Sequence, residues 1–249
     1  MLQQTQVERV IPFYTKFVKK FPTARALARA PLRDVLKSWQ GLGYNRRAKF
    51  LHATAKELQD ISFSSYRTEL ICDEVVWKLE KLPGVGPYTA RAIAAFAYNQ
   101  DVVFVETNIR TAVIHHFFNT AKERKGMIYH TSERKYHDAE IEKILKELLP
   151  KGKAREWYSA LMDYGAYLKR SGVRINARTR GYTKQSKFAG SLREARGAIL
   201  RALTSRERSP YALAQVLGPE RRAQVKRALA QLCREQMVVC RRGVCTLPN

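Results

Sequence analysis

The sequence is poor in acidic residues, in cysteine and in long apolar runs. Its 249 residues include 22 Asp and Glu against 46 Lys and Arg, which gives a formal net charge of +24. No uninterrupted apolar run approaches the ~20 residues that a membrane-spanning helix needs, and no secretory signal pattern opens the chain. We therefore expect a cytoplasmic, nucleoid-associated protein without a membrane partner, long enough to bury a core without cross-links.

The cysteines are Cys72, Cys233, Cys240 and Cys245, too few for the disulfide framework of a secreted protein of this length. A metal site built on the last three is the alternative. It lacks a CxxC pair and a nearby histidine to complete a ligand set, so we predict no metal site.

The excess of basic residues runs along the whole chain. Residues 182–249 alone hold 14 Lys and Arg against 4 Asp and Glu. A charge of this size suits a polyanionic partner, so we expect both halves of the protein to face nucleic acid.

The stretch from Leu82 to Arg110 reads "LPGVGPYTARAIAAFAYNQDVVFVETNIR" and predicts a helix, a glycine hairpin and a second helix. Gly84 and Gly86 are expected to take positive φ, and Pro87 fits the first position of the second helix. Free N–H groups at that helix start suit a DNA phosphate. An ordinary helix connection with a glycine stop is the alternative.

After the second helix, an apolar run places Glu106 beside Thr107, a candidate N-cap for a helix from Asn108 to Phe118. The alternative for this lone carboxylate is a capping role only.

Before this stretch, helical spacing predicts helices over 6–21, 23–30 and 31–39, with the apolar positions of the first helix in the core. Between them and the next helix lies the loop "QGLGY". Its Leu42 and Tyr44 stand near Arg47, an arrangement that suits wedging into a base stack. A buried loop anchor is the alternative.

The C-terminal part predicts helices over 136–149 and 154–168, a basic linker over 170–190, and a small domain over 191–249. This last domain combines three helices, over 192–203, 210–217 and 219–235, with a β-hairpin that turns near Arg242 and Gly243. It resembles a winged-helix domain whose wing, including Arg241 and Arg242, faces DNA. A protein-interaction wing is the alternative.

Two motifs, "LPGVGPYTARAIAAFA" and "VETNIRTAV", resemble the HhH-GPD superfamily of DNA glycosylases. Within it, "MLQQTQVERVIPFYTKFVKKFPT", "VLKSWQGLGYNRRAKFLH" and "MDYGA" are similar to the adenine DNA glycosylase (MutY-type) branch. The resemblance implies a mainly α fold, with an HhH-GPD glycosylase domain over 1–169 that lacks the first helix of the family. It implies double-stranded DNA with a mispaired base as the partner, and we expect a monomer.

The resemblance also assigns roles to residues. Glu106 would stabilise the sugar cation formed when the base leaves. DNA contacts would come from these positions: Gln3, Gln4, Leu42, Tyr44, Arg47, Gly84, Val85, Gly86, Tyr88, Thr89, Asn108, Arg241 and Arg242. Related bifunctional enzymes carry a Schiff-base lysine where this chain has Tyr88, so we predict no amine-catalysed strand cleavage.

Three departures from the family stand out. The family usually has Asp at the position of Glu106. It usually carries an iron-sulfur cluster on four cysteines after the "MDYGA" helix, where this chain has none, so we expect no cluster and no other cofactor. Its purine-protonating glutamate precedes the segment that matches "MLQQTQ", where this sequence begins; either the start is truncated or another group supplies the proton.

The predicted function is hydrolysis of the N-glycosidic bond of adenine mispaired with guanine or 8-oxoguanine. Two alternatives remain: a mismatch thymine or uracil glycosylase on the same fold, and a catalytically inactive DNA-binding module.

Overall fold

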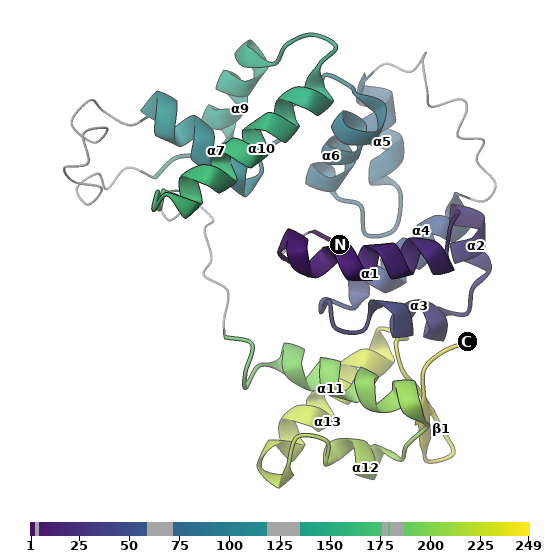
Figure 1. The fold of residues 1–249 in the computed structure, drawn as a ribbon. Coiled ribbons are helices and arrows are strands. Elements are labelled where there is room, and N and C mark those ends of the chain that lie inside the picture. Colours follow the sequence, from purple (N-terminus) through teal and green to yellow (C-terminus); the bar gives the residue numbers. More distant parts are fainter. Residues whose placement is uncertain (3–4, 59–71, 119–134, 176–178, 180–186) are drawn as a thin grey trace. The chain divides into compact units, whose positions relative to one another are not determined.

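The structure is a computed structural model that describes residues 1–2, 5–58, 72–118, 135–175, 179 and 187–249. It is mainly helical, as predicted (Figure 1), and it packs into two compact units. One unit joins residues 1–62 with residues 185–249, and the other comprises residues 63–184. No helix in the described ranges is long and apolar enough to cross a membrane.

The first unit is built from both ends of the chain. Its elements are α1 (Val7–Lys20), α2 (Ala24–Arg29), α3 (Leu32–Trp39), α4 (Arg46–Glu57), α11 (Leu192–Ser205), α12 (Pro210–Ala214), η4 (Pro219–Arg221), α13 (Arg222–Arg234), β1 (Val239–Arg241) and β2 (Val244–Thr246). One apolar cluster runs through it and includes Val35 of α3, Ile199 of α11 and Leu232 of α13, each fully buried. The packing thus groups the C-terminal segment with the first four helices. The predicted domains, 1–169 and 191–249, divide the chain at different points and stay a prediction.

Helix α1 departs from the predicted core. Of its apolar positions, Val10 and Phe17 are buried, whereas Val7, Ile11 and Tyr14 are each more than half exposed. The expectation that all apolar positions of this helix face the core of their unit is wrong. An apolar stripe at helical spacing shows which side chains share a face, but it does not show that another element of the same unit covers that face.

The C-terminal elements follow the predicted order. The hydroxyl of Ser191 caps α11 by accepting a hydrogen bond from Glu194 N, at 3.3 Å. Strands β1 and β2 pair antiparallel and turn at Arg242 and Gly243, both with positive φ. Three helices and a two-stranded hairpin are therefore present, and the winged-helix assignment stays a prediction.

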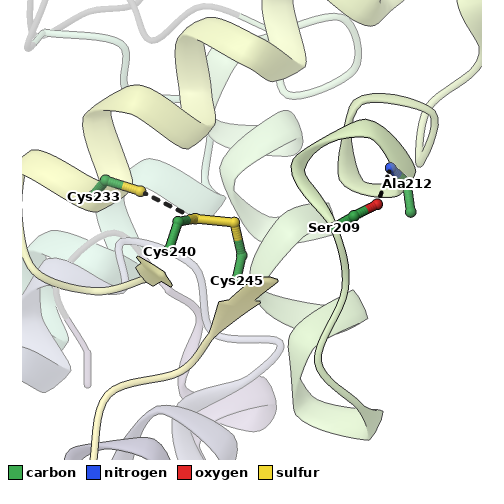
Figure 2. The surroundings of a disulfide bond; sticks show 5 residues. All are labelled: Ser209, Ala212, Cys233, Cys240 and Cys245. Atoms are coloured by element: carbon green, nitrogen blue, oxygen red, sulfur yellow. Dashed lines mark hydrogen bonds between the residues drawn. A yellow bond between two sulfur atoms is a disulfide. The ribbon is translucent and has the colours of Figure 1, made fainter. Parts of the chain in front are cut away.

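Cys240 and Cys245, paired directly across β1 and β2, form a disulfide that the sequence analysis did not predict. Figure 2 shows Cys233 of α13 pointing toward it, with its sulfur 3.7 Å from the sulfur of Cys240. In the same view, Ser209 caps α12 by accepting a hydrogen bond from Ala212 N, at 3.1 Å. The three cysteines considered as a metal site thus lie together, and two of them are joined covalently.

The second unit holds α5 (Cys72–Glu80), α6 (Pro87–Tyr98), α7 (Thr107–Val113), η2 (Ile114–Phe118), α9 (Asp138–Leu148) and α10 (Ala154–Arg170). Helix α6 starts at Pro87 as predicted, and its Ala90 and Ala94 are fully buried. Small side chains at this spacing allow close approach of a neighbouring helix. Tyr158 of α10 is fully buried in this core, and its hydroxyl donates a hydrogen bond of 2.9 Å to Val102 O.

Candidate active site

Glu106 lies at the junction between a buried extended segment and helix α7. Val102 and Phe104 are buried ahead of it, and Glu106 has extended φ and ψ of −115° and 162°. Its Oε2 accepts a hydrogen bond from Asn108 N, at 2.6 Å. Glu106 is therefore itself the N-cap of α7, and the expectation that Thr107 caps a helix from Asn108 is wrong by one residue. The cap uses one carboxylate oxygen.

The hairpin between α5 and α6 has one position in the left-handed region. Gly84 has a φ of +74°, as predicted, and Val85 N donates to Leu82 O over 3.1 Å. Gly86 has a φ of −96°, so its predicted positive φ is wrong. Instead Gly86 is the N-cap of α6. Because glycine has no side chain, no N-cap side chain covers the start of the helix at Pro87.

Tyr88, in the first turn of α6, lies within electrostatic reach of Glu106. Its ring packs edge-on against Phe104, with centroids 5.9 Å apart, and 39% of the residue is exposed. Burial raises the pKa of the Tyr88 hydroxyl, and the negative charge of Glu106 raises it further. The hairpin helix thus brings a neutral phenol to the carboxylate. Thr89, the next predicted contact, is half-buried in the same turn.

Lys169 of α10 completes this cluster. Its ammonium donates to Asn108 Oδ1 over 2.7 Å. Burial lowers the pKa of Lys169, Glu106 raises it and Arg110 lowers it again, so the lysine lies in the field of the proposed catalytic carboxylate. Asn108 is consequently held at two points, by Glu106 through its backbone and by Lys169 through its side chain.

Close packing of α10 on α7 explains how Lys169 reaches this place. A Cβ at Gly165 would overlap the carbonyl group of Asn108, so only glycine permits the observed contact. Lys169 follows Gly165 by four residues and shares its helix face. The sequence analysis missed Lys169. Its spacing from the glycine of "MDYGA" is the signal that would have pointed to it.

Helix α7 is also anchored from its other side. Arg110 makes a two-pronged contact with Asp138 of α9, at 2.9 Å and 2.8 Å. Such paired hydrogen bonds fix orientation as well as position. The first turn of α7, which carries Glu106 and Asn108, is therefore held by both α9 and α10.

In the first unit, the loop from Gly41 to Tyr44 carries both predicted wedge residues, Leu42 and Tyr44, and the two differ in exposure. Leu42 is only 5% exposed and belongs to the core, so the expectation that it is presented to DNA is wrong. Tyr44 is 39% exposed, and Arg47 lies with its guanidinium carbon 5.4 Å from the ring centroid. The loop thus buries its aliphatic residue and presents its aromatic one.

The remaining predicted contacts fall in other places. Gln3 and Gln4 lie outside the described residues. Arg241 and Arg242 are exposed at the tip of the β1–β2 hairpin. The structure brings Tyr88, Glu106 and Asn108 together in the second unit, whereas Tyr44 and Arg47 belong to the first.

The residues present do not fit the family's iron-sulfur cluster. Such a cluster is held by four cysteine thiolates, and the chain has no cysteine between Cys72 and Cys233. In the described part of the chain, no group of three or more His, Cys, Asp or Glu is arranged to hold a metal ion.

Comparisons with known proteins agree with this geometry. The family model of the HhH-GPD superfamily base excision DNA repair protein matches residues 1–150. An adenine DNA glycosylase of Mycolicibacterium smegmatis is 32% identical over 218 residues, which cover 82% of this chain and 69% of that protein. One from Buchnera aphidicola (subsp. Baizongia pistaciae) is 34% identical over 172 residues, or 68% of this chain and 43% of that protein.

Among solved structures, a thermostable thymine-DNA glycosylase superposes with a TM-score of 0.48 at 24% identity, over 66% of this chain and 69% of that one. The match to the Buchnera relative spans less than half of that relative's length. The family model covers more than half of the present chain, including the hairpin at Gly84 and Glu106. The chain belongs to the HhH-GPD superfamily of base excision DNA repair proteins.

Proposed function

We propose that this protein is a monofunctional DNA N-glycosylase that removes adenine mispaired with guanine or 8-oxoguanine. The observation that carries the proposal is the cluster of Glu106, Asn108 and Tyr88 at the facing starts of α7 and α6. The similarity to the two adenine DNA glycosylases, at 32% and 34% identity, supports the proposal.

The substrate must first leave the duplex. Extruding a nucleotide costs a few kcal/mol, which contacts to the backbone offset. The positive dipole end of α6, whose N-cap Gly86 carries no side chain, favours a phosphate, and the hairpin at Gly84 lets the DNA backbone approach closely. The net charge of +24 adds attraction to any DNA sequence.

Bond cleavage then leaves a cationic sugar. One oxygen of Glu106 accepts from Asn108 N, and the same carboxylate carries the negative charge that stabilises this cation. Lys169 holds the amide of Asn108, so the residue next to the carboxylate presents a fixed side chain to the nucleotide. Water then adds its oxygen to C1′ of the cation, and the proton that it releases neutralises the departed adenine.

No lysine stands at position 88, where related bifunctional enzymes carry their Schiff-base amine. We expect base removal without strand cleavage, and borohydride treatment during turnover should trap no covalent protein–DNA product. We also propose that the protein works as a monomer and without an iron-sulfur cluster, so that the purified protein should contain no stoichiometric iron.

The decisive experiment incubates duplexes containing A:8-oxoG, A:G, T:G or U:G with the protein, then cleaves abasic sites with alkali. Glu106→Gln is the matched variant, because the glutamine amide oxygen keeps the cap of α7 while the negative charge is removed. Product from the two adenine duplexes that is lost in the variant supports the proposal.

Other outcomes contradict it. Product from T:G or U:G alone would assign a thymine or uracil glycosylase. Salt-sensitive binding with no abasic product on any duplex would leave an inactive DNA-binding module.

A further inference from the structure

The ring of Tyr44 lies beside two guanidinium groups that come from distant parts of the sequence. The guanidinium carbons of Arg47 and Arg193 lie 5.4 Å and 5.6 Å from the ring centroid. Arg193 also donates a hydrogen bond of 2.8 Å to the Tyr44 hydroxyl, across 149 residues of sequence. All three residues belong to the first compact unit.

The backbone beneath this ring is fixed. Tyr44 itself has a φ of +48°, which is unusual for a residue with a bulky side chain. Next to it, Gly43 O accepts a hydrogen bond of 3.1 Å from Trp39 Nε1, and Leu42 is anchored in the core. After it, Arg47 N donates to Tyr44 O over 2.9 Å. A strained conformation held on both sides is typical of a functional loop rather than of a simple connection.

The resulting surface has the chemistry of a nucleobase platform. Tyr44 is 39% exposed, and an exposed aromatic ring can stack on an unpaired base of any kind. Arg193 beside it supplies a cation for a nucleotide's phosphate, whereas Nε and Nη2 of Arg47 are buried and its Nη1 donates to Met1 O over 3.4 Å.

We propose that Arg193 is a positioning residue that holds the Tyr44 ring as a platform for an unstacked base of the bound DNA. The segment 187–249, through α11, then takes part in reading the DNA strand. This inference deepens the proposed function and rests on it for the identity of the DNA substrate.

The experiment uses a duplex that carries a tetrahydrofuran abasic-site analogue opposite 2-aminopurine, so that binding is measured without any base excision. Stacking of a protein ring on 2-aminopurine quenches its fluorescence. The full-length protein is compared with Arg193→Gln, Tyr44→Leu, Tyr44→Phe and the double variant Arg193→Gln with Tyr44→Leu.

Arg33→Gln is the matched control. Arg33 donates a hydrogen bond of 3.0 Å to Asn249 Oδ1, so it also connects the first four helices to the C-terminal segment and carries the same charge. It makes no contact with Tyr44 in the described contacts of that ring.

Tyr44→Leu should abolish the quench and weaken binding about tenfold, as expected for the loss of one stacked base. Arg193→Gln should lose most of the quench and weaken binding about fivefold, more than Arg33→Gln does. When Tyr44 is already replaced by leucine, Arg193→Gln should weaken binding by no more than Arg33→Gln weakens it in the parent protein. Should Arg193→Gln fail to fold, Tyr44→Phe removes the same hydrogen bond without changing the charge and should reduce the quench.

A full quench in Arg193→Gln, with binding equal to that of Arg33→Gln, would overturn the inference. A wild-type protein that binds this duplex without any quench would overturn it as well. Because no base is excised in this experiment, its result is separate from the alkali assay, whose failure concerns the proposed reaction alone.

Discussion

The ammonium group of Lys169 is 2.7 Å from the side-chain oxygen of Asn108, whose backbone N–H is bound in turn by Glu106. Lys169→Met should therefore lower the single-turnover rate of base excision about 10- to 100-fold, because a hydrogen bond to a charged group contributes about 1.5–3 kcal/mol. The rate is measured at saturating enzyme, so that binding does not limit it.

Lys146→Met removes the same charge from an exposed position on α9 and is the control. Lys169→Arg, which keeps a cationic donor, should recover part of the rate. Equal rates for the two methionine variants would show that Lys169 does not act on the site.

Glu106→Asp separates the cap from the chemistry. Aspartate is a good N-cap, so the thermal stability should stay close to that of the parent protein. The carboxylate would retract by roughly one methylene, and a shift of about 1 Å in a reacting group costs on the order of 100-fold in rate. Single-turnover kinetics and a thermal melt together test this, and an unchanged rate would show that the carboxylate position tolerates the family's usual residue.

Gly165→Ala tests the contact between α10 and α7. The added methyl group would overlap the carbonyl of Asn108, so the free energy of unfolding should fall by about 3 kcal/mol, at the upper end of overpacking effects. Chemical denaturation measures this loss.

Gly197→Ala is the control for the helical glycine itself. Nothing lies within 4 Å of a Cβ at Gly197 in α11, so alanine there should raise stability by roughly 0.5–1 kcal/mol. Two glycine-to-alanine changes in helices should thus have opposite signs. Equal effects would contradict the close packing at Gly165.

His52 gives the first unit a pH-dependent stability. It is 4% exposed, and its Nε2 lies 2.9 Å from Ala30 O. Burial lowers the pKa of His52 below the ordinary 6.5, so the unfolded chain takes up the proton at a higher pH than the folded one. The contribution is complete above pH 6.5 and is lost as the pH falls toward the lower folded pKa.

His52→Gln keeps a donor for Ala30 O but does not titrate. Its free energy of unfolding should therefore fall less than that of the parent protein between about pH 7 and pH 5, measured by denaturant titration at each pH. Parallel curves would show that folding does not lower the pKa of His52.

Local rules predicted the elements that local chemistry decides. Pro87 fixed the start of α6, and Gly243 after Arg242 marked the hairpin turn, because proline fixes φ and glycine accepts a positive φ whatever surrounds them. The position of Glu106 between an apolar run and a helix followed from the same kind of pattern.

Packing between distant segments decided the rest. Burial of Leu42 and exposure of Ile11 depend on which elements cover them, and their own helices or loops carry no such information. The contact of Lys169 with Asn108 spans 61 residues, and that of Arg193 with Tyr44 spans 149. Such contacts arise only when the helices are assembled.

Glu106 begins α7 with one oxygen while it carries the charge assigned to the reaction. The same side chain therefore caps a helix and serves the substrate, so each substitution at this position has to be judged on both properties. Residues at this position must accept the hydrogen bond from Asn108 N, and among polar side chains that can do so only a carboxylate also carries the negative charge. Homologous proteins should accordingly show fewer residue types at position 106 than at position 107. The exposed side chain of Thr107 neither caps the helix nor carries a charge.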